Sequence, residues 1–172
     1  DKFVCEHYNA FTQFEAVVKN LPSGVHKLSV LVDNSFSEAS ALHVGNDYQS
    51  YGGISRGVMI EQLPKHYIKQ LHFTPVCKDD TWYAQLELVI ASLDGKPWKG
   101  KVSVSLKGCD DVNENVLYTQ SCSTGAGELV LKSDLIACEN AKPWAAEHPT
   151  LYMLSAQLED EDGKVIDDLT DL

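Results

Sequence analysis

The residues best suited to chemistry lie in one stretch, residues 46–58, which reads Asn-Asp-Tyr-Gln-Ser-Tyr-Gly-Gly-Ile-Ser-Arg-Gly-Val. Asp47 and Arg56 place opposite charges near its two ends, and Tyr48 and Tyr51 offer aromatic faces that carry hydroxyl groups. The adjacent glycines give the backbone a freedom that other residues lack. The combination favours a loop that binds a polar ring such as a sugar, although a plain Gly-Gly hairpin or bulge would use the same glycines.

Each residue of this loop also has a structural interpretation. Asp47 could cap its own turn, because an Asp side chain readily accepts hydrogen bonds from nearby backbone amides. Tyr48 and Tyr51 could pack beneath the loop instead of stacking on a ligand. For Arg56 we expect an ion pair or backbone carbonyl contacts that hold the loop, ahead of a contact with sugar. We predict that these four residues are the substrate-binding residues of this chain, with Asp47 the leading one.

The other reactive side chains do not form a recognisable centre. Acidic clusters occur at Asp79-Asp80, at Asp110-Asp111 and in residues 159–162, all in expected turns, where solvated carboxylates are common. The six histidines include no pair with the spacing of metal ligands on a shared face. We therefore predict no catalytic residue, no metal and no cofactor in this chain.

The net charge restricts the binding partners that this chain can have, and the cysteines indicate its cellular compartment. A net charge of −11 argues against nucleic acid and anionic membranes as partners, because Lys and Arg supply the affinity for phosphate. The sequence has no signal peptide and no apolar run near the ~20 residues that a membrane helix needs. Its five cysteines are widely spaced and odd in number, which favours reduced thiols in the cytoplasm. A disulfide between Cys109 and Cys122 is the alternative, if the parent protein is secreted.

Alternation of apolar and polar residues with a period of two predicts an all-β fold. Helical patterns are rare, and hairpin signals such as Asp94-Gly95 and Asp162-Gly163 recur along the chain. Trp82 and Leu86 share one face of an expected strand, and we predict that this face belongs to the core. The expected strands are residues 14–18, 27–32, 58–62, 68–74, 82–91, 101–106, 115–121, 128–131, 152–159 and 164–169.

Two domains are expected, residues 1–65 and residues 66–172. Pro64 would break a strand ladder at this boundary, and the strand pattern restarts after it. About seven strands in the second part fit an immunoglobulin-like β-sandwich. The first part has only three or four expected strands, too few to close a jelly roll. Its open edges predict pairing in a homo-oligomer, or local disorder.

Three motifs in order resemble glycoside hydrolase family 2. Residues 6–18 and residues 30–61, which include the loop, are similar to parts of the sugar-binding jelly roll of that family. Residues 143–154 read Pro-Trp-Ala-Ala-Glu-His-Pro-Thr-Leu-Tyr-Met-Leu and are similar to its Trp-Ser-Pro-Glu-x-Pro-x-Leu-Tyr signature, and residues 162–167 are similar to its closing hairpin. The resemblance implies a partial, galactose-binding-like jelly roll before the sandwich. Trp144 could belong to the core or form a surface platform, and we expect it to pack against the edge of the sandwich.

The resemblance also implies a function for the parent protein. Members are retaining glycosidases whose two Glu residues lie in a (β/α)8 barrel, and no position of this chain matches a barrel motif. We therefore expect a non-catalytic fragment that supports a barrel of the same chain and contributes Asp47 near the β-glycoside substrate. β-Glucuronidase is the first expected activity of the parent and β-galactosidase the second. A stand-alone carbohydrate-binding or adhesion module with two sandwiches is the alternative.

Overall fold

The structure is a computed structural model that describes residues 2–9, 12–35, 52–54, 56–111, 114–125 and 127–171. All regular elements in these residues are β-strands, which confirms the all-β prediction. The chain divides into two compact units, Asp1–Glu61 and Gln62–Leu172. Within the described residues, no helix is long and apolar enough to cross a membrane.

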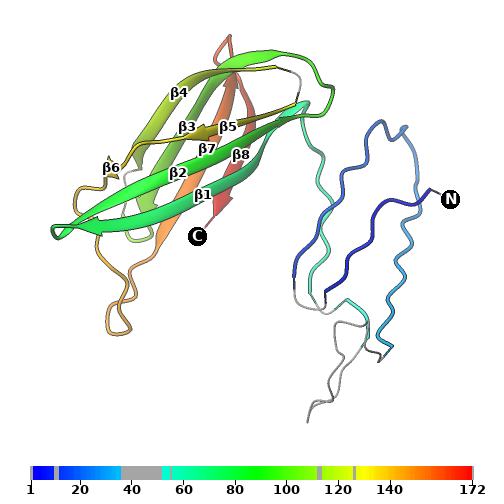
Figure 1. Cartoon of the computed structure of the whole chain (residues 1–172), viewed down its shortest axis with the longest axis horizontal. Coiled ribbons are helices and arrows are strands. Elements are labelled where there is room, and N and C mark those ends of the chain that lie inside the picture. Colours follow the sequence, from blue (N-terminus) through cyan, green and yellow to red (C-terminus); the bar gives the residue numbers. More distant parts are fainter. Residues whose placement is uncertain are drawn as a thin grey trace. The chain divides into compact units, whose positions relative to one another are not determined.

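The second unit is a sandwich of two antiparallel sheets (Figure 1). One sheet contains β1 (His66–Lys78), β2 (Thr81–Ser92) and β5 (Glu128–Lys132) in that order, and the short β6 (Ile136–Ala137) also pairs with β2. The other sheet has the order β4-β3-β7-β8, with the bounds β3 (Trp98–Gly108), β4 (Asn115–Thr124), β7 (Tyr152–Asp160) and β8 (Val165–Asp171). Two stacked antiparallel sheets with these crossovers form the immunoglobulin-like sandwich that the sequence predicts.

The seven strands expected after residue 66 all form, with shifts of a few residues at their ends. The hairpin between β1 and β2 turns on Asp79 and Asp80, whose φ angles of 48° and 59° suit the two central positions of a type I′ turn. The prediction omitted β6, because a strand of two residues has no detectable period.

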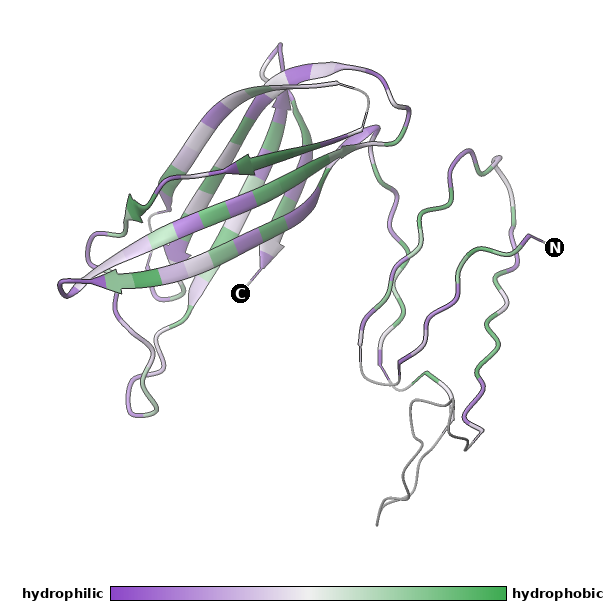
Figure 2. Ribbon diagram, in the orientation of Figure 1, coloured by the Kyte–Doolittle hydropathy of each residue, from purple (hydrophilic) through white to green (hydrophobic). Residues whose placement is uncertain are grey.

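Alternate residues of both sheets build the core, and Figure 2 shows the resulting alternation of hydrophobic and hydrophilic residues along β1 and β2. Leu86 is buried, as predicted. Trp82 lies on the same face, near the start of β2, and is partly exposed. Each fully buried Leu or Val removes enough apolar surface from water to contribute roughly 1.5–3 kcal/mol. The central cluster consists of Ile68, Leu86, Leu88, Ile90, Val102, Val104, Leu131, Ala156 and Leu158.

Two side-chain hydrogen bonds satisfy backbone amides that the ladders leave open. The register between β1 and β2 shifts between Ile68 and Gln70, and the Ile68 amide donates to Asp167 Oδ2 of the opposite sheet at 2.7 Å. The Leu86 amide of β2 donates to Ser133 Oγ at 2.9 Å, in the gap between β5 and β6. A buried amide without a hydrogen-bond partner lowers the stability of the fold, and these two bonds remove that cost. They also link segments that are far apart in the sequence.

The first unit differs from the expectation. Its described residues contain no strand, so the strands expected at residues 14–18 and 27–32 are not formed, and that expected at 58–62 is not formed either. Every described residue from 2 to 61 is exposed. Figure 1 draws this unit as coil that runs back and forth. A strand needs a paired neighbour and a covered apolar face, and the described residues of this unit provide neither.

Candidate functional site

The predicted sugar-contact loop lies mostly outside the described residues. Asp47, Tyr48 and Tyr51 are among the residues that the structure does not describe. Arg56 is described, has an exposed side chain, and forms no ion pair within the described part of the chain. The ion pair or backbone carbonyl contacts expected of Arg56 therefore stay a prediction.

Gly52 of this loop lies close to Asn34. A Cβ atom on Gly52 would lie 2.8 Å from the side-chain Cγ of Asn34, so a larger residue at position 52 would require the Asn34 side chain to move. Gly53 has a φ of 111°, which few other residues tolerate. Asn34 and Gly52 lie on either side of residues 35–51 in the sequence, and we call Asp33, Asn34 and Gly52 the loop base.

Asp33 stabilises the base of the loop. Its Oδ1 accepts hydrogen bonds from the Ser35 hydroxyl and from the Ser35 amide, the latter at 2.8 Å. Both bonds favour the charged carboxylate, and the hydroxyl bond is the main reason that the pKa of Asp33 lies below its usual range. The prediction did not include Asp33 and Asn34. The Asp-x-Ser spacing, which suits a local turn, was the available signal.

A second polar cluster lies at one end of the sandwich. The His66 ring stacks on Trp98 with centroids 5.8 Å apart, and its Nε2 lies 3.2 Å from the Lys96 carbonyl oxygen. Ser92 Oγ and Asp94 Oδ1 approach the same nitrogen at 3.3 Å and 4.0 Å. A catalytic triad needs the Ser on one ring nitrogen and the carboxylate on the other. The cluster lacks this arrangement, and its contacts close the loop between β2 and β3.

The acidic residues of the sandwich lie in turns and in strands. Asp79 and Asp80 occupy the β1–β2 turn. In another turn, the backbone amide of Asp111 donates a hydrogen bond to the carbonyl oxygen of Gly108. Glu159 was assigned both to the expected strand 152–159 and to an acidic turn; it lies in β7, as the strand prediction had it, and forms an ion pair with Lys101 at 2.8 Å. Cross-strand pairing with a lysine on the neighbouring strand explains its place in the ladder.

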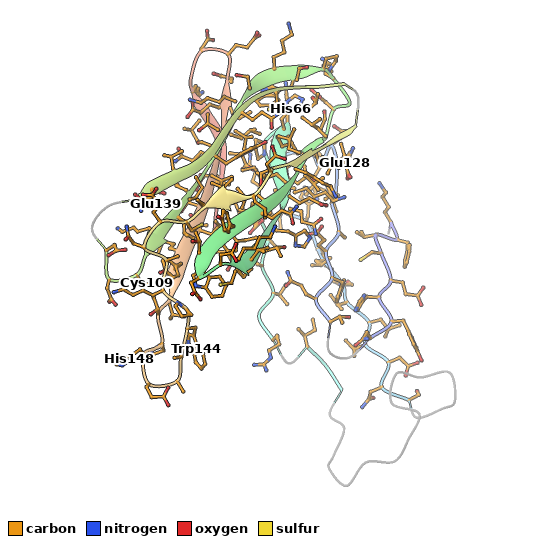
Figure 3. All side chains as sticks on the ribbon, turned by 60° about the vertical axis from the view of Figure 1, so that its left-hand side comes forward. His66, Cys109, Glu128, Glu139, Trp144 and His148 are labelled. Atoms are coloured by element: carbon orange, nitrogen blue, oxygen red, sulfur yellow. The ribbon has the colours of Figure 1, made fainter. Side chains whose placement is uncertain are left out.

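The loop between β6 and β7 presents Trp144 to solvent. Trp144 is 62% exposed, so the expectation that it packs against the edge of the sandwich was wrong. Figure 3 shows Trp144 and His148 on a loop that extends beyond the sheets. Ala145 and His148 exchange two backbone hydrogen bonds, and the Lys142 amide donates to Tyr152 Oη at 2.7 Å. These bonds shape the loop independently of the core.

Two surface grooves of the sandwich are candidates for a sugar site. One, about 640 Å³, is lined by residues of β3, β4, β7 and the turn after β7, and the ion pair of Lys101 with Glu159 lies in its wall. The smaller, about 400 Å³, lies between residues 62–64 and β8. No group of three potential metal ligands occurs in the described residues, and all five cysteines are free thiols. Neither groove presents an aromatic side chain on which a sugar could stack.

The family follows from comparison with known proteins. The model of glycosyl hydrolases family 2 matches residues 66–171, so this chain belongs to that family. A solved structure described as a family 2 beta-galacturonidase from Eisenbergiella tayi, bound to galacturonate, is 40% identical. It matches 98% of this chain and 29% of its own chain, with a TM-score of 0.83.

Two curated relatives match at lower identity. A protein of Formosa agariphila, named provisionally as a beta-glucuronidase, is 26% identical over 88% of this chain. The beta-galactosidase BgaC of Bifidobacterium adolescentis is 28% identical over 87% of it. The chain spans 18% and 14% of the lengths of these two relatives.

Proposed function

We propose that this chain is the non-catalytic accessory region of a longer, retaining family 2 glycoside hydrolase that hydrolyses O-glycosidic bonds. The observation that supports this most is the 40% identity to the Eisenbergiella tayi enzyme over 98% of this chain but only 29% of that one. A catalytic barrel of the same polypeptide is then the principal partner. The two catalytic carboxylates of a retaining glycosidase would then belong to that barrel.

The proposed substrate is a β-glycoside, with glycosides of uronic acids ranked first. β-Glucuronide is the first candidate, β-galacturonide is added by the Eisenbergiella tayi relative, and β-galactoside is the next. Asp47 would accept hydrogen bonds from adjacent sugar hydroxyls, because a carboxylate can accept two at once. Tyr48, Tyr51 and Arg56 would complete the loop near the substrate.

We also propose the organisation of the parent protein around this chain. The boundary between a jelly-roll part, residues 1–65, and the sandwich, residues 66–172, is supported by the start of β1 at His66. Pairing of the first unit in a homo-oligomer is supported by its exposed apolar side chains, such as Phe14 and Leu31. The five free thiols support a reducing compartment such as the cytoplasm.

The first test is the mass of the native gene product, detected on a denaturing gel with an antibody against this chain. We expect a band several-fold heavier than 19.0 kDa. A band near that mass would overturn the accessory role and leave the stand-alone carbohydrate-binding module, which would have to bind sugars unaided.

The second test concerns Asp47 in the longer product, assayed on chromogenic β-glucuronide, β-galacturonide and β-galactoside. Asp47→Ala removes charge-assisted hydrogen bonds to substrate and should lower kcat/KM about 10- to 100-fold. Glu15→Ala, an exposed carboxylate of the same unit, is the matched control and should leave kcat/KM unchanged. Equal kinetics of the two variants would remove Asp47 from the proposed site without affecting the family assignment.

A further inference from the structure

Strand β4 is an open edge of its sheet. The sheet has the order β4-β3-β7-β8, and within the described residues β4 pairs with β3 alone. Figure 1 shows β4 on the outer side of the sandwich. One side of its backbone therefore presents amide and carbonyl groups that a further strand could pair with.

The other edges of the sandwich are protected in ways known to prevent such pairing. β8 carries Asp167, Asp168 and Asp171. β1 contains Pro75 and a register shift near Lys69. β5 and β6 are only five and two residues long. Charges, proline, bulges and short length are the features that keep edge strands from pairing with other molecules.

β4 has almost none of these protections. Its ten residues, Asn-Val-Leu-Tyr-Thr-Gln-Ser-Cys-Ser-Thr, include no charged residue and no proline, in a chain whose net charge is −11. Its one irregularity is a register shift at Leu117, because Val104 faces Tyr118 while Ser105 faces Val116. The regular part of the edge is therefore the seven residues from Tyr118 to Thr124.

We propose that this edge pairs antiparallel with the β4 edge of a second copy of the chain, across a two-fold axis at Ser121. This register places Gln120 opposite Cys122 of the other copy and Tyr118 opposite its Thr124, so that side chains of the same sheet face meet. Tyr118 and Cys122 pack against the core, whereas Gln120 between them is exposed at the open edge. A neighbouring strand would cover Gln120.

Charge favours a second copy over a charged partner. Two β4 edges meet without like charges, whereas two β8 edges would bring three Asp residues from each copy together. Two lysines of β3 lie directly opposite residues of β4. Lys101 lies opposite Ser121 and is neutralised by Glu159, and Lys99 lies opposite Ser123. An interface built on seven residues falls well below the ~1,200 Å² of stable complexes, so the dimer is weak and depends on concentration.

The test uses the whole 172-residue chain and sedimentation velocity over a wide range of concentrations. We expect a monomer–dimer equilibrium and, at high concentration, slowed amide hydrogen exchange in residues 118–124. In the Ser121→Asp variant, the new carboxylate lies opposite Lys101 of its own sheet, which keeps the monomer stable. Across the two-fold axis it would meet the same carboxylate of the second copy, which opposes dimerisation. It should raise the dimer Kd about tenfold, the equivalent of 1.4 kcal/mol.

Thr170→Asp on the protected β8 edge is the matched control, because it adds the same charge, and should leave the dimer Kd unchanged. A mixture of Ser121→Asp and Ser121→Lys should regain dimerisation, since the two residues meet only if Ser121 lies on the axis. A monomer at all concentrations overturns the proposal, as does a dimer in which Ser121→Asp and Thr170→Asp act alike. If the Ser121→Asp variant does not fold, amide hydrogen exchange of the unmodified chain at high concentration is the deciding measurement. Slowed exchange confined to residues 2–61 would assign the pairing to the first unit and overturn the proposal.

Discussion

The two units of this chain have the same sequence pattern and opposite burial. Both alternate apolar and polar residues, yet all the buried hydrophobic residues of the described chain belong to Gln62–Leu172. In the first unit, Leu28, Val30 and Val32 alternate as a strand would and are all exposed. Alternation therefore predicts that a face is suited to burial, and a second sheet is what buries it.

The largest expected effect comes from the centre of the sandwich. Leu88→Ala removes a fully buried side chain and should lower the free energy of unfolding by about 2–5 kcal/mol. Leu31→Ala in the first unit, where Leu31 is 95% exposed, should change it by less than about 0.5 kcal/mol. Urea unfolding followed by tryptophan fluorescence measures this, because Trp82, Trp98 and Trp144 all lie in the second unit.

Circular dichroism provides a probe that covers both units during the same unfolding. If Leu31→Ala shifted the fluorescence transition as much as Leu88→Ala, the first unit would share the core of the second. The contrast in burial between the units would then be wrong.

The next effect tests the link between the sheets of the sandwich. Asp167→Ala leaves the Ile68 amide without its acceptor and removes a hydrogen bond to a charged group, so we expect a loss of about 1.5–3 kcal/mol. Asp168→Ala changes the exposed neighbour on the same strand and serves as the control. The two urea midpoints should differ clearly; equal midpoints would show that Asp167 contributes no more than a surface carboxylate.

A smaller effect is expected at the gap between β5 and β6. Ser133→Ala removes the acceptor of the Leu86 amide inside the sandwich and should cost about 1 kcal/mol. Ser123→Ala on the exposed face of β4 is the matched control and should cost little. A larger loss for the Ser123 variant than for the Ser133 variant would contradict the assigned hydrogen bond.

The sequence predicted most of the sandwich because its strands are long enough to show their period. The two side-chain hydrogen bonds that link its distant segments could not be predicted from the sequence. Asp167 and Ile68 are 99 positions apart, and Ser133 and Leu86 are 47 positions apart. A local pattern indicates which face a residue lies on, and it does not indicate which distant amide a side chain will reach.

The candidate site was less accessible to the same reasoning. Asp47, Tyr48 and Tyr51 lie outside the described residues, and Arg56 is exposed. Asn34 and Gly52 approach each other through a contact that depends on the fold of both segments. The motif around Trp144 placed this residue at the edge of the sandwich, but the side chain is exposed. The motif identifies the residue, whereas the hydrogen bonds within its loop determine the loop's conformation.

The smallest expected effect concerns acid, and it compares one carboxylate from each unit. The pKa of Asp94 is lowered, chiefly by the hydrogen bond from the Lys96 amide, and that of Asp33 is lowered by Ser35. A carboxylate whose pKa is lower in the folded state stabilises that state above its ordinary pKa of about 3.9. The contribution is lost as the pH falls from there through the folded pKa.

Asp94→Asn should therefore reduce the acid sensitivity of the sandwich slightly, seen as a smaller shift of the fluorescence urea midpoint between neutral pH and about pH 3. Asp33→Asn should leave that shift unchanged, because Asp33 stabilises only the base of a loop in the first unit. Both carboxylates are exposed, so solvent screening keeps either effect small. A change in the midpoint shift with Asp33→Asn would mean that the loop base is coupled energetically to the sandwich, and the two units would then not unfold independently.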